Sequence, residues 1–285
     1  MKRLTLVAVA CLLLSAAPAR AHERNKTHTA TVTGDIDPEE TLQDKPLVYK
    51  NKLGNSKGNK VVIMMHNSDV KVIGHNSDEV VIEAASHQAP PARAAGLKPL
   101  YNQAEDNTGM GLSVSKEGNT LTVTKASRQD GKYTIRVPKN ASVMYEETNW
   151  MGGDLSIADV EGEIELKLNN GNATLSNITG PVVANATSSD MVIKFSSLNQ
   201  SKPSAISTVA GTVDIHLPAS TKANFKLKTI QGEIYSDFDM NIARDSKSNL
   251  PRVTGGNNID GKTNGGGVEM NLYTISGDMY IRKSK

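Results

Sequence analysis

The chain has 285 residues, of which 32 are basic and 30 acidic, and it contains one cysteine, Cys11. This near-neutral charge leaves no electrostatic footprint for nucleic acid or for an anionic lipid surface, so neither is expected as a partner. Only three Phe and one Trp are present, and a thin core of Val, Ile and Leu explains this better than a bulky globular core.

Residues 1–21 have the pattern of an export signal. Two basic residues precede an apolar stretch at 4–14, and Ala19 and Ala21 are the small residues that a signal peptidase recognises. The apolar stretch is shorter than the roughly 20 residues of a membrane span, so no integral membrane segment is expected after signal removal. A Sec-type signal predicts export to the periplasm, the outer-membrane surface or the extracellular space.

Cleavage after Ala21 changes the charge and the redox chemistry of the chain. It removes three basic residues and no acidic one, so that 29 bases (32 − 3) face 30 acids. It also removes Cys11, which leaves no disulfide, thiol nucleophile or thiolate metal site. A lipid anchor on Cys11 is the alternative, but this cysteine lies early in the signal and three apolar leucines follow it.

The next segment, residues 22–58, is predicted to be flexible. It is polar and lacks periodicity, and such a composition cannot bury enough apolar surface to offset the entropy of ordering. A folded β domain is predicted over residues 59–285. It begins with short strands at 61–65, 70–74 and 79–84, which are separated by two Asn-Ser-Asp turns nine residues apart.

Residues 85–118 interrupt the strands with a proline-containing stretch that shows no alternation. A loop of this length in a compact domain is usually functional or mobile. Arg93, Lys98 and Tyr101 would line a binding surface there, and the alternative is a loop that packs on the side of the domain without a ligand. The strands that follow are predicted at 121–124, 133–137 and 142–147.

The stretch from Gly153 to Phe195 repeats every nine residues. Its units are GDLSIADVE, GEIELKLNN, GNATLSNIT, GPVVANATS and SDMVIKFSS. The third and fifth residues of each unit are apolar, which places these side chains on one face of a β-strand. A short fixed period of strand and corner is typical of a solenoid, in which each unit buries its apolar face by stacking on its neighbours.

The predicted fold is therefore all-β, a single-stranded β-solenoid with nine-residue half-coils, about 18 residues per coil. Three six-residue sides per coil are the alternative. Two long side loops are predicted, at 85–118 and at 239–266. The second is rich in Gly, Asn and Ser and is either a protruding loop or a long hairpin. Near the C-terminus, the charges of Lys283 and Lys285 would protect the last strand edge of the solenoid from stacking end to end with another molecule.

A family resemblance rests on three segments: YTIRVPKNASV, the glycine-led units, and the closing GGGVEMNLYTISGDMYIRK. In these segments the chain, from about residue 60 to residue 283, resembles the exported DUF4097 family, whose members are described as adhesin-like. The resemblance implies a β-solenoid and an export address. It transfers no catalytic or binding residue, because the family has no established activity to transfer.

A nine-residue period is also found in the calcium β-roll, whose repeat supplies stacked aspartates. In this chain the third position of every unit is apolar, so calcium is not expected at the turns. His66 and His75 lie nine residues apart and would stack on adjacent coils, but a zinc site needs three or four ligands and no third one is evident. No metal or cofactor is predicted.

Glu163 and Glu165 lie on the outward side of one predicted strand, roughly 7 Å apart. This separation suits the carboxylate pair of a glycosidase. Lys167 on the same face favours a solvated surface of mixed charge instead. Asn-x-Ser/Thr sites occur at Asn140, Asn172, Asn177 and Asn185, inside predicted strands or corners. Ladders of asparagine side chains between coils explain these sites at least as well as glycans do.

Trp150 and Tyr145 are the candidate surface-binding residues, because an exposed aromatic ring just ahead of the repeat would stack on a sugar. The alternative is that Trp150 plugs a corner of the core. We expect a non-enzymatic, exported envelope or cell-surface protein, an adhesin-like binding or scaffolding module whose ligand is a glycan or a protein. The alternative function is a carbohydrate-active β-helix enzyme that acts on a polysaccharide.

Overall fold

Two β-sheets of ten strands each make up the part of the chain that the structure describes. The computed structural model describes residues 47–54, 58–87, 91–240 and 257–284, all within the unit that begins at Asp44. In these ranges the single helix is η1 (Ala92–Ala94), a 3-10 helix, and no helix is long and apolar enough to span a membrane. The all-β prediction is thus confirmed.

The predicted export signal, with Cys11, Ala19 and Ala21, lies outside the described residues. The same holds for residues 22–46 of the segment that was expected to be flexible.

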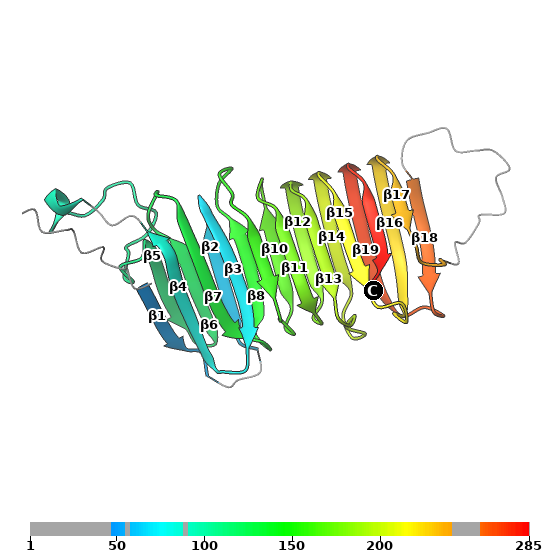
Figure 1. The fold of residues 1–285 in the computed structure, drawn as a ribbon, viewed down its shortest axis with the longest axis horizontal. Coiled ribbons are helices and arrows are strands. Elements are labelled where there is room, and N and C mark those ends of the chain that lie inside the picture. The colour runs from blue at the N-terminus through cyan, green and yellow to red at the C-terminus, as the bar shows by residue number, and fades with distance from the viewer. Residues whose placement is uncertain (1–46, 55–57, 88–90, 241–256, 285) are drawn as a thin grey trace, which may run out of the picture. The chain divides into compact units, whose positions relative to one another are not determined.

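The spatial order of the strands within each sheet can be followed across Figure 1. Sheet A contains, in that order, β1 (Leu47–Lys52), β4 (Glu79–His87), β7 (Gly131–Pro138), β3 (Ser68–His75), β9 (Leu155–Ala158), β11 (Ala173–Ile178), β13 (Met191–Phe195), β15 (Val213–Leu217), β20 (Met279–Lys283) and β17 (Ile234–Ser236). Sheet B contains β18 (Asn257–Thr263), β16 (Ala223–Gln231), β19 (Val268–Ser276), β14 (Ser204–Ala210), β12 (Val182–Ser188), β10 (Ile164–Leu168), β8 (Ser142–Glu147), β2 (Lys60–Met65), β6 (Thr120–Lys125) and β5 (Leu112–Glu117).

Through the repeat, successive strands alternate between the two sheets and pair in parallel with the strand one coil away. Leu155 of β9 lies beside Ala173 of β11, and Ala173 lies beside Met191 of β13, so that each step is eighteen positions (155, 173, 191). The next step in sheet A is longer, because Met191 pairs with Val213 of β15. In the repeat strands β9 to β13 the inward residues are buried, and they belong to one core cluster of mainly Val, Ile and Leu.

The coils do not stack strictly in the order of the sequence. In sheet A, β3 lies between β7 and β9, and in sheet B, β2 lies between β6 and β8. At the other end, β19 lies between β14 and β16, and β20 lies between β15 and β17. The expectation that Lys283 would blunt the final edge is therefore wrong, because β20 pairs on both sides and the terminal strands are β17 and β18.

Two strands occupy segments that were expected to lack them, and a third lies in the segment for which a long hairpin was the alternative. β1 falls within residues 22–58, β5 within the predicted loop 85–118, and β18 within the predicted loop 239–266. Each is an end strand that pairs antiparallel, with β4, β6 and β16 respectively, and so satisfies its backbone by closing the sheet. A search for the parallel repeat misses such strands because their partners run in the opposite direction.

Close stacking at the corners explains the glycines of the repeat. Gly162 and Gly180 are eighteen residues apart, and a Cβ atom at Gly180 would meet the carbonyl oxygen of Gly162. A larger residue would force the two corners apart.

Polar ladders run along two further corners and connect one coil to the next. The side-chain oxygen Oδ1 of Asn172 accepts a hydrogen bond from the backbone N–H of Asp190 (3.0 Å), and Oδ1 of Asp190 accepts one from that of Thr212 (2.7 Å). At the other corner, Nδ2 of Asn177 donates to Oδ1 of Asp159 (2.6 Å). Asn172 and Asn177, which both belong to Asn-x-Ser/Thr sites, are thus members of ladders, as expected.

Candidate functional site

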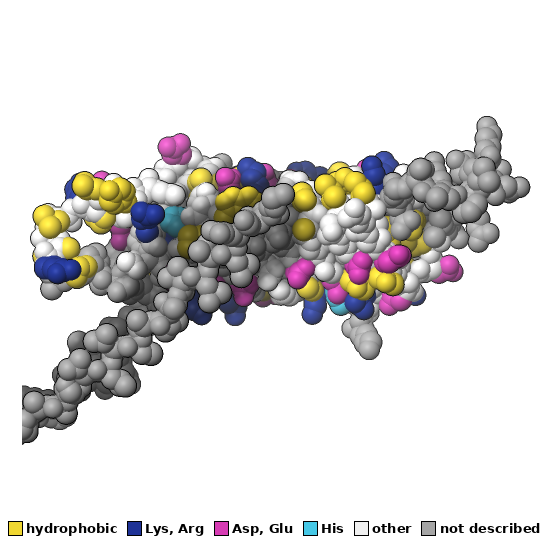
Figure 2. All heavy atoms as spheres, turned by 90° about the horizontal axis from the view of Figure 1, so that it is seen from above, with side chains coloured by type: hydrophobic (Ala, Val, Ile, Leu, Met, Phe, Trp, Pro, Cys, Tyr) yellow, Lys and Arg dark blue, Asp and Glu magenta, His cyan; other side chains and the backbone are white. Residues whose placement is uncertain are grey.

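The long loop between β4 and β5 forms one wall of an open groove of about 880 Å³. The opposite wall is the turn between β6 and β7, at residues 127–129. Figure 2 shows hydrophobic and basic side chains together at the end of the view where Figure 1 places this loop. The loop residues that line the groove are Pro91, Ala94, Leu97, Lys98, Pro99, Leu100, Tyr101, Asn102, Ala104, Glu105 and Asp106.

Three large apolar side chains of this loop are exposed to solvent. The exposed fractions are 71% for Leu97, 91% for Leu100 and 79% for Tyr101. Burying such a side chain on contact with a partner contributes about 1.5–3 kcal/mol. Contiguous exposed apolar surface of this kind marks interaction sites in soluble proteins.

Basic groups stand beside the apolar ones. The Arg128 guanidinium lies 5.9 Å from the ring centroid of Tyr101, and Nζ of Lys98 lies 2.9 Å from Oε1 of Glu105. The structure thus places Lys98 and Tyr101 in the groove, as part of the predicted surface. Arg93 lies exposed in η1 and is not part of the lining.

The base of the loop is held by Asp106. Its carboxylate accepts hydrogen bonds from the backbone N–H groups of Thr108 (2.9 Å), Gly109 (2.9 Å) and Gly111 (2.8 Å). Burial by itself raises the pKa of Asp106, but these hydrogen bonds and the Thr108 hydroxyl outweigh burial and hold the pKa below its usual value. Asp106 therefore stays ionised and keeps the turn closed at neutral pH.

A buried lysine connects this base to the two sheets. Nζ of Lys125 donates to Oη of Tyr133 (2.7 Å), and Oη of Tyr133 donates to the carbonyl oxygen of Met110 (2.8 Å). Burial lowers the pKa of Lys125 to about 8, in spite of the nearby carboxylates of Asp130 and Asp106. The base of the exposed apolar loop is therefore held in place by the hydrogen bonds of Asp106, Lys125 and Tyr133.

Lys125 and Tyr133 were not singled out from the sequence, although a signal was present. In TLTVTK, Lys125 continues the inward positions Leu121 and Val123, and Tyr133 begins the inward positions of YTIRV. A charged residue at an inward position requires a buried partner, and here that partner is the tyrosine hydroxyl.

Comparison with known proteins adds a family. The model of the family described as Toastrack DUF4097 matches residues 139–282, half of the chain. The chain belongs to the Toastrack DUF4097 family. No curated protein matches it.

Two solved structures resemble the Toastrack chain at low sequence identity. One is described as a "putative cell adhesion protein" from Clostridium sporogenes; it is 12% identical with a TM-score of 0.42, and the match covers 84% of this chain and 100% of that one. The other is described as a "putative adhesin" from Bacteroides fragilis; it is 14% identical with a TM-score of 0.33, and the match covers 85% and 98% of the two chains.

The two aromatic residues singled out from the sequence have opposite environments in this Toastrack chain. The side chain of Trp150 is 64% exposed, whereas Tyr145 is wholly buried in β8. Tyr145 as a surface-binding residue is therefore a wrong prediction. The alternation of β8 buries Val143, Tyr145 and Glu147 on the same face, so the strand pattern itself turns Tyr145 inward.

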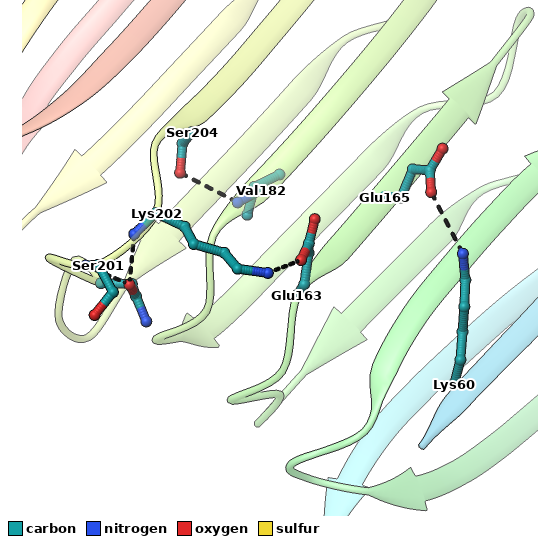
Figure 3. A network of polar contacts seen from close by, with 8 residues as sticks. Lys60, Glu163, Glu165, Val182, Ser201, Lys202 and Ser204 are labelled. Atoms are coloured by element: carbon teal, nitrogen blue, oxygen red, sulfur yellow. Dashed lines mark hydrogen bonds and ion pairs between the residues drawn. The ribbon is translucent and has the colours of Figure 1, made fainter. Parts of the chain in front are cut away.

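The two candidate carboxylates are each held by a separate lysine, as Figure 3 shows. Oε2 of Glu163 lies 2.8 Å from Nζ of Lys202, and Oε2 of Glu165 lies 3.6 Å from Nζ of Lys60. The side chains are part-exposed on the outer surface of sheet B. This is the surface of mixed charge that Lys167 indicated.

The two histidines with nine-residue spacing have separate hydrogen-bond partners. Nδ1 of His66 lies 3.2 Å from the hydroxyl of Thr148, and Nε2 of His75 lies 2.7 Å from the carbonyl oxygen of Glu79. Burial, followed by the charge of Lys125, lowers the pKa of His66. Within the described ranges, no three His, Cys, Asp or Glu side chains come together as a metal site.

Proposed function

We propose that this Toastrack protein is an exported, non-enzymatic module that binds a glycan or protein of the envelope or cell surface in an adhesin-like manner. The observation that carries the proposal is the groove with exposed Leu97, Leu100 and Tyr101. Its apolar tip stands on a base fixed by Asp106 and Lys125. A rigid base limits the entropy that is lost when a ligand binds.

The scaffold that we propose is a β-solenoid built from coils of two nine-residue halves. The eighteen-residue register steps through β9, β11 and β13 support this unit. Parallel ladders and corner hydrogen bonds make such a stack stiff, so that loops inserted into it are displayed at fixed positions.

A polysaccharide-cleaving enzyme is the alternative, and the outer surface gives it little support. A glycosidase needs one protonated and one ionised carboxyl group that face a common space. Glu163 and Glu165 instead pair with lysines that come from different segments. Release of reducing sugar from any polysaccharide by the purified wild-type protein would overturn the non-enzymatic proposal.

The binding proposal is tested with the chain from residue 22 onward and isolated bacterial envelopes. Wild type is compared with a variant that carries Leu97→Ser, Leu100→Ser and Tyr101→Ser, and Val209→Ser serves as the matched control at an exposed apolar position outside the groove. We expect the triple variant to sediment with envelopes at least tenfold more weakly and the control to match wild type. Equal binding by the triple variant and wild type would remove the groove as the ligand surface.

A further inference from the structure

The outer face of sheet A carries a row of side chains that changes character near the C-terminal strands. The row is formed by register partners in β9, β11, β13, β15, β20 and β17, one residue from each strand. In the first three strands these residues are small or aliphatic: Ser156, Thr174 and Val192. In the last three strands they are Asp214, Tyr280 and Tyr235.

The two tyrosine rings stack face to face. Their centroids lie 5.2 Å apart and the ring planes differ by 12°. The guanidinium of Arg282 lies 4.9 Å from the centroid of the Tyr280 ring. Nε of Arg282 donates to both carboxylate oxygens of Asp214 (2.9 and 3.1 Å), and Nε2 of His216 lies 3.2 Å from the same carboxylate.

This arrangement leaves Tyr235 at the open end of the stack. Tyr280 contacts Tyr235 on one side and Arg282 on the other, whereas no strand of the described residues follows β17 in sheet A. The side chain of Tyr235 is 50% exposed. A cross-strand aromatic pair also stabilises a sheet, but stability alone does not account for a second ring left half in solvent and fixed in orientation.

The chemistry around Tyr235 fits a sugar. The C–H groups on one face of a pyranose form a flat apolar surface, and the negative face of an aromatic ring attracts it. Only Nε of Arg282 is used in hydrogen bonds within the described residues, so its terminal N–H groups remain available to hydroxyl or carboxylate oxygens at the rim of that sugar. The stack therefore combines an apolar platform with polar groups beside it.

A peptide strand added to the sheet edge fits less well. β17 contains three residues, Ile234–Ser236, and offers few backbone groups for strand addition. Recognition at this place must therefore rest on side chains. We propose that Tyr235, Tyr280 and Arg282 form a binding platform on which a pyranose unit of a glycan stacks against Tyr235.

This platform is separate from the loop groove, and its test uses other residues. Native affinity gels contain soluble xylan, laminarin, galactomannan, dextran or polygalacturonate. We expect at least one of these polysaccharides to retard wild type, Tyr235→Ala to bind at least tenfold more weakly, and Tyr235→Phe to bind within about threefold because the ring remains. Thr174→Ala, at the equivalent outward position of β11, should behave as wild type.

Bacterial envelopes treated with periodate, which cleaves the vicinal diols of sugars, provide the second arm. Binding to a glycan that carries vicinal diols predicts that wild type loses its Tyr235-dependent binding to treated envelopes. No retardation in any of the five gels, or equal retardation of Tyr235→Ala and wild type, would overturn the proposal. So would Tyr235-dependent binding to envelopes that survives periodate and is lost after protease treatment, because the ligand would then be a protein.

Discussion

Glu147 is the residue whose removal should most clearly destabilise the stack of coils. It lies at the end of β8 with 4% of its surface exposed. Its carboxylate accepts hydrogen bonds from three successive backbone N–H groups of the next corner, those of Asn169 (2.5 Å), Asn170 (2.9 Å) and Gly171 (3.1 Å). A Cβ atom at Gly171 would collide with this carboxylate, so the corner is built around it.

The expected loss follows from the burial of the three donors. Gly171 is buried and Asn169 half-buried, whereas Asn170 is exposed and its N–H can turn to water. Two donors therefore lose a charged acceptor without replacement, at about 1.5 kcal/mol each. Glu147→Ala should lower the free energy of unfolding by about 3 kcal/mol, which corresponds to roughly 6–12 °C in Tm for a domain of this size.

Urea denaturation followed by far-UV circular dichroism and by the fluorescence of Trp150 measures this effect. Trp150 is the only tryptophan of the chain and lies three positions from the substitution, so it reports local opening of the corner. Glu146→Gln is the matched control, because the neighbouring Glu146 pairs with Lys167 (3.3 Å) at the surface and should change stability by less than about 1 kcal/mol. Equal midpoints for the two variants would refute the reasoning.

The core, the corners and the N-terminus give three further predictions. The pKa of Lys125 is about 8 in the folded chain and 10.5 in its ordinary state, so between pH 8 and 10.5 the unfolded chain binds more protons and the stability of the fold rises with pH. Relative to Lys125→Met, the free energy of unfolding of wild type should therefore increase by about 2 kcal/mol from pH 8 to 9.5. Urea midpoints of the two proteins that change in parallel with pH would contradict this. Gly180→Ala should lower the free energy of unfolding by about 1–3 kcal/mol, because the added Cβ meets the carbonyl oxygen of Gly162. The control Thr174→Ala, at an outward position, should change it by less than about 0.5 kcal/mol, and thermal unfolding measures both. N-terminal sequencing of secreted protein should begin at His22, and an intact N-terminus would exclude cleavage after Ala21.

The part of the fold that the sequence predicts is the part in which local pattern and burial agree. Leu155 and Ile157 are buried, as are Ile164 and Leu166, because strict alternation leaves one face for the core. The same alternation extends to Lys125, so the sequence alone predicts that this charged side chain points into the core, although it does not show which residue pairs with it. The partner, Tyr133, becomes evident only when β6 and β7 are seen to face a common interior.

The order of the coils could not be predicted, because it depends on pairing between distant segments. β19 and β20 enter between coils that precede them in the sequence, and nothing in GVEMNLYTI states which neighbours it will pair with. End strands such as β1 and β5 were missed for the same reason, since an antiparallel partner is supplied by the fold and not by the nine-residue period.

In this Toastrack chain, the residues that bear on function are those at positions that the repeat does not determine. Core burial dictates every second residue and close stacking dictates the corners, whereas an outward position is constrained more weakly, by cross-strand pairing and by solubility. At equivalent outward positions the chain places Ser156 and Thr174 in one region and Tyr280 and Tyr235 in another, on parallel strands of the same sheet. A cross-strand aromatic pair stabilises the sheet, but the ring of Tyr235 remains half in solvent at the last strand, which agrees with the glycan platform proposed above. The same argument applies to Leu100, whose exposure contributes nothing to the core beneath it.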